Sequence, residues 1–345
     1  MRCTLALLAS AAVIGGIGWL TTSESGLQTA IQLAERGTGG QLHIADASGQ
    51  LLGNLDIGQL SWQAPDLQVE ATQIHLNWTP SSLFHGALQI AELRMATLHI
   101  ASTPSPTPTP APTDLQLPVA VNAKKVAISK FSYGEAFVAS ELEGSFSSDG
   151  RQHRLTEFHG LTGDVAITGH AKLDGLAPLP LDASTNITGQ FDQRPLAMSL
   201  TARGPLERIA LSAVATQGVA GHADVALTPF AAAAFASARI VLENLDPATW
   251  QPNAPQAKLS ISADIQPQDG GVIGSFGLTN HQPGPFDRQR LPIATLAGTV
   301  DWQGATGKFA SLHATLPGSG ELDGSGEWRD GALSPVVSSG TSLVR

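Results

Sequence analysis

The residue types that perform catalysis or bind metals are scattered along this sequence, without the spacing that such chemistry needs. The ten histidines form no H-E-x-x-H run or comparable pair that would aim two imidazoles at one metal ion. Cys3 is the only cysteine, which leaves neither an intrachain disulfide nor a cysteine-based zinc site. No G-x-S-x-G sequence offers a nucleophilic serine. We therefore expect a protein that is not an enzyme and has no metal or other cofactor.

Two short motifs resemble the turns of acid proteases, namely Asp46-Ala-Ser-Gly49 and Asp323-Gly-Ser-Gly326. Both fall where strands are expected to meet, and Asp, Ser and Gly are common turn residues. We interpret both motifs as turns between strands.

The composition favours a β protein with a substantial apolar surface. Apolar residues make up 42% of the 345 residues and charged residues 14%, against about 25% charged residues in an ordinary soluble domain. The 36 glycines and 22 prolines favour many turns and short strands over long helices. The formal net charge of −10 argues against nucleic acid as a partner, because such binding depends on clustered cations.

The amino terminus predicts a membrane anchor. Residues 4–20 carry no charge, and as a helix they span about 26 Å, close to the roughly 30 Å of a bilayer core. A cleaved signal peptide is the alternative, but the residues after Leu20 lack the small-residue cleavage pattern. Because Arg2 is the only nearby cationic side chain, the rest of the chain should lie outside the cytoplasm. We expect residues 1–22 to be a cytoplasmic stub and transmembrane signal anchor.

A short amphipathic helix is expected next, within residues 23–40. Leu27, Ala30, Ile31 and Ala34 have the spacing of a single apolar stripe. Three glycines then end the helical pattern. We predict a juxtamembrane helix whose stripe packs on the sheet that follows.

From residue 41 onwards the hydrophobic period changes from 3.6 to 2. Apolar and polar residues alternate through residues 67–78, which is typical of a strand with one buried and one wet face. Residues 41–102 are expected to form a first β segment. Residues 103–118, TPSPTPTPAPTDLQLP, cannot join a sheet interior and predict a polyproline-II linker or an exposed loop. We place an organisational boundary there, and recruitment of a partner by the Pro-rich segment is the alternative.

Residues 119–345 are expected to repeat with a period of about 50 residues. Gly169, Gly221, Gly274 and Gly324 are separated by steps of 52, 53 and 50 residues, and an alternating run surrounds each. A fixed period of this size indicates a linear stack of strands, whereas chance matches in a Gly-rich chain are the alternative.

A stacked sheet of this kind has one continuous apolar face. If a second sheet covers that face, it is a dry core, and if it stays open, it is a trough for acyl chains. Periodicity alone does not decide between the two. The residues expected to line such a lipid groove are Ile74, Leu76, Trp78, Leu88, Ile90, Val165, Ile167, Val225 and Leu227.

Two runs within residues 1–102 carry a family resemblance. They are G-x-L-x-x-x-L-x-I-x-x-L-x-W at residues 49–62 and L-x-W-x-P-x-x-L-x-x-G-x-L-x-I-x-x-L at residues 76–93. Together with the preceding apolar segment and short helix, they resemble the amino-terminal portion of the TamB family, within the wider AsmA-like group. The later repeats resemble that family only in style.

The resemblance implies an elongated, mostly β structure, an open β-groove called a β-taco, in the bacterial periplasm behind a single-pass inner-membrane anchor. It implies transport of phospholipid acyl chains between the inner and outer membranes. The alternative that it implies is a scaffold for outer-membrane protein assembly or secretion, with a TamA-type barrel as partner. Members of the family are several times longer, so we expect this chain to be truncated at its carboxy terminus. The region that contacts the barrel would then be missing.

Overall fold

The computed structural model describes residues 24–51, 53–102, 110–191, 193–249, 254–329 and 332–340. The expectation of a mostly β fold is confirmed, because strands β1–β19 make up most of this part of the chain. The expected anchor, residues 1–22, lies outside it. Within the described ranges, no helix has both the length and the apolar character needed to cross a membrane.

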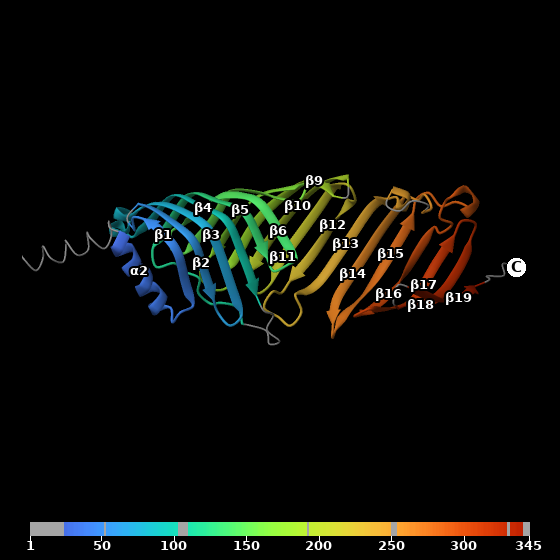
Figure 1. Cartoon of the computed structure of the whole chain (residues 1–345). Coiled ribbons are helices and arrows are strands. Elements are labelled where there is room, and N and C mark those ends of the chain that lie inside the picture. The colour runs from blue at the N-terminus through green and yellow to red at the C-terminus, as the bar shows by residue number, and fades with distance from the viewer. Residues whose placement is uncertain are drawn as a thin grey trace, which may run out of the picture. The chain divides into compact units, whose positions relative to one another are not determined.

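The contacts divide the chain into two units, whose helix and strands are labelled in Figure 1. Unit 1 comprises Met1–Thr107 and Pro112–Leu179, and unit 2 comprises Pro108–Ala111 and Pro180–Arg345. The division therefore falls after Leu179, whereas the sequence suggested a boundary at residues 103–118. The strands on the two sides of that Pro-rich segment are paired within one sheet, as described below.

Unit 1 is a sheet of strands that pair in chain order, with one helix at its first edge. Every neighbouring pair is antiparallel except β4 and β5, which are parallel. The elements are α2 (Glu24–Gly37), β1 (Leu42–Gly49), β2 (Asn54–Gln63), β3 (Leu67–Thr79), the 3-10 helix η1 (Pro80–His85), β4 (Ala87–Ser102), β5 (Ala120–Tyr133), β6 (Phe137–Ser148), β7 (Gln152–Thr162) and β8 (Val165–Asp174).

Unit 2 continues the same strand-and-turn pattern, with antiparallel pairing from each strand to the next. Its elements are β9 (Pro180–Phe191), β10 (Arg194–Pro205), β11 (Ile209–Gln217), β12 (Ala220–Leu227), β13 (Phe235–Leu245), η2 (Pro247–Thr249), β14 (Leu259–Gln268), β15 (Gly271–Asn280), η3 (Phe286–Arg288), β16 (Thr295–Gln303), β17 (Thr306–Leu316), β18 (Gly320–Arg329) and β19 (Ala332–Gly340).

Helix α2 covers the edge of β1. The side chain of Gln28 donates to the Ala47 carbonyl at 3.2 Å, and the Ile44 N–H donates to the Glu35 carboxylate at 3.0 Å. Leu27 is 1% exposed, and Ala30 and Ile31 are half-buried, whereas Ala34 is exposed. Most of the predicted stripe thus packs on the sheet, and the helix satisfies backbone groups that an edge strand would otherwise leave free.

The Pro-rich segment joins the only parallel pair of strands in the described sheets. Parallel neighbours require a crossover connection that brings the chain back to the end where the first strand began. Seventeen residues separate Ser102 from Ala120, and extended at about 3.1 Å each they reach about 53 Å, similar to the length of the 16-residue β4. The segment is therefore long enough to return beside one strand.

The end of this crossover is tied to the sheet. The Leu115 N–H donates to the Gly175 carbonyl at 2.7 Å, and the Leu117 N–H donates to the Gly150 carbonyl at 2.7 Å. The Ala177 N–H donates to the Thr113 carbonyl at 3.0 Å. Residues 113–117 therefore belong to unit 1 as a short paired segment.

Replacing Pro106, Pro108 and Pro110 together by Ser should leave the strand content unchanged, because a proline donates no ladder hydrogen bond. Leu115→Pro is the matched contrast, since it removes the N–H that bonds Gly175. We expect it to destabilise unit 1 by about 1–3 kcal/mol. Circular dichroism gives the strand content and the thermal midpoint. A large loss of β signal in the triple variant would contradict the prediction.

Polar residues with left-handed backbone lie inside several strands. Asp46 (φ 55°) in β1 and Gln73 (φ 49°) in β3 both lie opposite Gly58 of β2 by the register. A Cβ atom at Gly58 would lie 2.7 Å from the Asp46 Cβ, so only glycine fits there. Similar positive φ angles mark register shifts at Glu141, Glu157, Asn244 and Ser311. These are β-bulges, which bend the strands that contain them.

The interpretation of the two acid-protease-like motifs as turns is wrong. Asp46-Ala-Ser-Gly49 ends β1, and Asp323-Gly-Ser-Gly326 lies inside β18. The four matched glycines of the expected period of about 50 residues lie in β8, β12, β15 and β18, so the successive steps cover four, three and three strands.

Candidate functional site

In unit 1 the register places most apolar side chains of the eight strands on one face of the sheet. For example, Ile57 lies opposite Ile74 on β2 and β3, and Met95 pairs with Ile128 on β4 and β5. Side chains of paired residues point to the same side of a sheet. We call this surface the unit 1 apolar face. It comprises Ile44, Ala47, Leu55, Ile57, Leu60, Ile74, Leu76, Trp78, Leu88, Ile90, Leu93, Met95, Leu98, Val121, Val126, Ile128, Leu142, Phe146, Leu155, Phe158, Val165 and Ile167.

Unit 2 has an apolar face of its own, built in the same way. Leu211 pairs with Val225 on β11 and β12, and Phe276 pairs with Gly298 on β15 and β16. Its main residues are Leu181, Ile187, Met198, Leu200, Ile209, Leu211, Val225, Leu227, Ile240, Leu242, Leu259, Ile261, Ile265, Phe276, Leu278, Leu296, Val300, Phe309, Leu312 and Leu322.

The residues predicted to line a groove are divided between these two faces. Seven belong to the unit 1 apolar face: Ile74, Leu76 and Trp78 on β3, Leu88 and Ile90 on β4, and Val165 and Ile167 on β8. The other two, Val225 and Leu227 on β12, belong to the face of unit 2. In unit 1 the structure adds residues from β1, β2, β5, β6 and β7 that the prediction left out, although they alternate in the same way.

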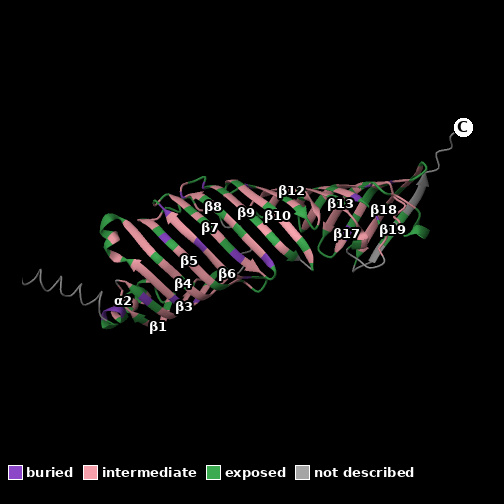
Figure 2. Ribbon diagram, turned by 90° about the horizontal axis from the view of Figure 1, so that it is seen from above, coloured by how far each residue is buried: buried purple, intermediate pink, exposed green. Residues whose placement is uncertain are grey.

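Both apolar faces are uncovered in the described part of the chain. A closed core would bury most of these side chains, yet only twelve hydrophobic residues are buried there. Most residues of the two faces are half-buried, which is the predominant class in Figure 2. In β14 and β18, half-buried and exposed positions alternate in phase with apolar and polar residues. Each face is therefore an open apolar surface.

The opposite face of each sheet is polar and carries paired charges. On unit 1, the Lys125 ammonium lies 3.2 Å from the Glu143 carboxylate. On unit 2, the Arg203 guanidinium lies 3.2 Å from the Asp182 carboxylate. Exposed pairs of this kind contribute little stability, about 0–1 kcal/mol each. Their effect is to keep one side of each sheet well solvated.

Ionisable groups with displaced pKa values lie on the polar faces or at turns. The hydrogen bond from Arg94 lowers the pKa of the Glu92 carboxyl. At the β8 end, the hydrogen bond from Arg151, with a second from a backbone N–H, lowers the pKa of Asp174. The stabilisation that such carboxylates provide is present above their ordinary pKa and is lost as the pH falls through the lowered value.

The pKa of His313 on β17 is raised, in contrast to the lowered pKa values of the two carboxyl groups. Its Nδ1 lies 2.9 Å from the Asp323 carboxylate on β18, and this hydrogen bond raises the pKa of the imidazole. The contribution to stability is therefore complete below the ordinary histidine pKa, and it is lost as the pH rises through the raised value. Both side chains are about half exposed, at 48% and 58%, so the contribution is small.

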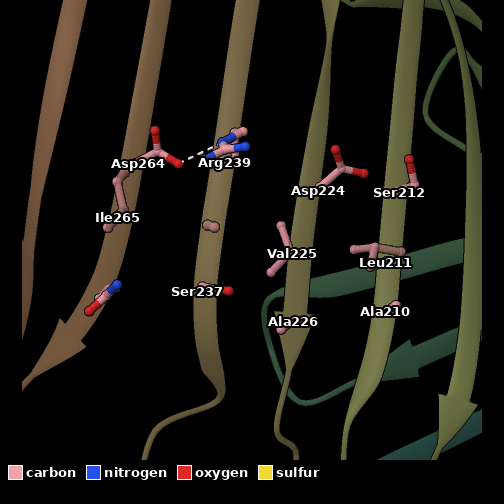
Figure 3. Close-up of a pocket in the computed structure, with 12 residues that line it drawn as sticks. Ala210, Leu211, Ser212, Asp224, Val225, Ala226, Ser237, Arg239, Asp264 and Ile265 are labelled. Carbon is pink, nitrogen blue, oxygen red and sulfur yellow. Dashed lines mark hydrogen bonds and ion pairs between the residues drawn. The ribbon is translucent and has the colours of Figure 1, made fainter.

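A hollow of about 470 Å³ lies across β11–β14 of unit 2 (Figure 3). Arg239 Nε bonds the Asp264 carboxylate at 2.7 Å, and Asp224 is the cross-strand partner of Arg239 on its other side. Ser212 and Val225 contribute to the walls. Over the residues that the structure describes, no group of three or more His, Cys, Asp or Glu side chains is placed to hold a metal ion. The hollow thus combines a charge pair with apolar side chains such as Val225 and Ile265.

Comparison with known proteins finds a family match in the first half of the chain. Residues 13–174 match the family model described as TamB, N-terminal domain. The matched range ends with Asp174, the last residue of β8, and so covers the strands of unit 1. The resemblance of this portion to TamB family proteins, predicted from the sequence, is confirmed. No curated protein and no solved structure matches the chain.

Proposed function

We propose that this chain, whose residues 13–174 match the TamB N-terminal domain, shields phospholipid acyl chains in transit between the inner and outer bacterial membranes. The match indicates TamB-family function in the translocation and assembly module. In this proposal the chain is a non-enzymatic conduit, with most of its length in the periplasm. Residues 4–20 would hold it in the inner membrane, and a TamA-type barrel would be its partner in the outer membrane.

The observation that carries this proposal is the uncovered apolar face of unit 1. Exposed apolar surface of this extent usually marks a place where another apolar body binds. An acyl chain gains about 0.8 kcal/mol per buried CH₂ group, so a dozen buried methylenes contribute about 10 kcal/mol. A lipid tail could therefore be held without any charged contact. The polar opposite face, with Lys125 paired to Glu143, would remain in water.

The alternative function is a scaffold for outer-membrane protein assembly or secretion. An exposed sheet edge binds an added strand through its free backbone groups. In unit 1, α2 already covers the edge of β1. We favour the lipid function because the apolar faces are far more extensive than the edges.

A photocrosslinking amino acid placed at Leu76 or Ile167 should capture phospholipid in living cells. Both residues belong to the unit 1 apolar face and lie on β3 and β8. Their chain neighbours His75 and Thr168 lie on the polar face, where His75 bonds Asp56 at 2.7 Å, and the same probe should capture little lipid there. Mass spectrometry of the crosslinked adducts identifies the lipid. Equal capture of phospholipid on the apolar and the polar face, or capture on neither face, would favour the scaffold function.

A further inference from the structure

The turn between β3 and β4 presents the most exposed large hydrophobic side chain in the described structure. Phe84 on η1 is 92% exposed, and its neighbour Leu83 is 43% exposed. Single exposed apolar residues are common on protein surfaces, but two adjacent ones at the tip of a turn form a small apolar knob. We call Leu83 and Phe84 the η1 tip.

The turn that carries the η1 tip is held firmly. Pro80 begins η1, and Gly86 ends it in the left-handed conformation (φ 70°) with its N–H directed at the carbonyls of Leu83 and Ser82. Gly86 in turn accepts a hydrogen bond from the Ala120 N–H of β5 at 3.0 Å. The Gln89 N–H donates to the Ser82 hydroxyl at 3.2 Å. Because the backbone is fixed on both sides, the exposure of Phe84 is a property of the fold.

The η1 tip lies on the same side of unit 1 as the start of α2. Gln28, in the first turns of α2, donates to the Ala47 carbonyl near the end of β1. The following β1–β2 turn contacts the end of β3, where the Trp78 N–H donates to the Gly53 carbonyl at 3.2 Å and Trp78 Nε1 donates to the Leu51 carbonyl at 3.0 Å. η1 begins two residues later. With neighbouring strands about 4.8 Å apart, the tip is roughly 20 Å from the start of α2.

The chemistry around the η1 tip suits a lipid surface. Residues 71–91 contain no Asp, Glu, Lys or Arg, so no formal charge of this stretch needs to be desolvated. Aromatic side chains are favoured at the interface between a bilayer and water. The uncharged residues 4–20 end only three residues before α2 begins at Glu24, so a bilayer that holds them lies close to this side of unit 1.

We propose that the η1 tip rests in the interfacial layer of the bilayer that holds residues 4–20. The tip then fixes the β3–β4 end of the unit 1 apolar face against the lipid surface, at the place where an acyl chain leaves the membrane. This inference rests on the membrane anchor of the proposed function.

The test uses the full chain in liposomes of neutral phospholipid. In a Cys3→Ser background, Ser81→Cys carries a fluorophore beside the η1 tip, and some lipids carry a nitroxide just below the headgroup. The matched control is a fluorophore at Glu135→Cys, in the β5–β6 turn at the opposite ends of the strands. Exposed aromatic residues also surround this site, with Tyr133 at 49% and Phe137 at 42%.

We expect nitroxide quenching at position 81 to be at least threefold stronger than at position 135. The double variant Leu83→Ser/Phe84→Ser should reduce it to the level at position 135, while the chain still floats with the liposomes through its anchor. Equal quenching at both sites, or quenching that the double variant leaves unchanged, would overturn the inference. If the chain does not float, the anchor and the inference fail together. Loss of lipid capture at Leu76 with strong quenching at position 81 would count against the acyl-chain function alone.

Discussion

Ile167→Asp is expected to weaken phospholipid binding about a hundredfold. Ile167 is half-buried on β8, opposite Gly160 of β7 and within the unit 1 apolar face. A carboxylate at this position keeps its water shell and interrupts contact with about four methylenes, which costs about 3 kcal/mol at about 0.8 kcal/mol each. A difference of 1.4 kcal/mol changes a binding constant tenfold, so 3 kcal/mol corresponds to about two orders of magnitude.

The measurement is the amount of phospholipid that co-purifies with the protein, determined by mass spectrometry. Thr168→Asp is the matched control, since it adds the same charge one residue away on the polar face. It should retain the bound lipid. Equal losses in the two variants, at unchanged strand content by circular dichroism, would mean that the apolar face does not bind the lipid.

Gly221→Val should destabilise unit 2 by about 3 kcal/mol. Gly221 lies in β12 between β11 and β13, and a Cβ atom there would come within 2.3 Å of the Val241 carbonyl oxygen and 3.1 Å of the Leu242 Cα. Both are backbone atoms, so the side chain is accommodated only if two paired strands separate. Overpacking of this kind costs about 1–3 kcal/mol or more.

Urea unfolding followed by circular dichroism measures this effect. With a denaturant slope of about 2 kcal/mol per molar, the midpoint should fall by about 1.5 M. Ala223→Val is the control, because Ala223 lies on the same strand and the same face and already carries a Cβ atom. We expect its midpoint to change by less than a third of that amount. Similar shifts in the two variants would show that the close approach at Gly221 is not the cause.

Much of the sheet could be predicted because alternation is a local property. The apolar and polar positions of β3, from Leu67 to Trp78, assign the two faces of that strand without any knowledge of its neighbours. All nine predicted lining residues belong to an apolar face for the same reason. The residues that were missed, such as Val126 and Leu142, follow the same rule in strands with more interruptions.

The bulges explain those interruptions. In β4 the apolar spacing is three residues between Ile90 and Leu93 and again between Met95 and Leu98. Within one strand such a break only suggests a change of register. It is a bulge where the neighbouring strand lacks the extra residue, as β3 does opposite Ile90 and Leu93, where the register shifts between Asn77 and Trp78. That alignment depends on strand pairing, which a single sequence does not reveal.

The parallel pair β4–β5 was also beyond prediction from the sequence. The Pro-rich segment has the composition of a linker. Such a composition fits a boundary between domains and equally fits a crossover connection between two strands of one sheet. Only the pairing of Ala87 with Ala120 and of Ile100 with Tyr133 distinguishes the two. The packing of α2 on β1 could be predicted in part from the sequence, because the apolar stripe that begins at Leu27 needed an apolar surface to pack on.

At Asp46, Gly58 and Gln73 one ladder pair is missing on each side of β2, so the regular ladder is interrupted along a line that crosses β1, β2 and β3 without a change of register. A pleated sheet is stiff where its ladder is regular and flexes most easily where the ladder is broken. We therefore expect β1, β2 and β3 to bend most easily along this line, with the strand halves on its two sides moving as stiffer units. Opening or narrowing the angle between these halves would change the width of the apolar surface without breaking a strand pair.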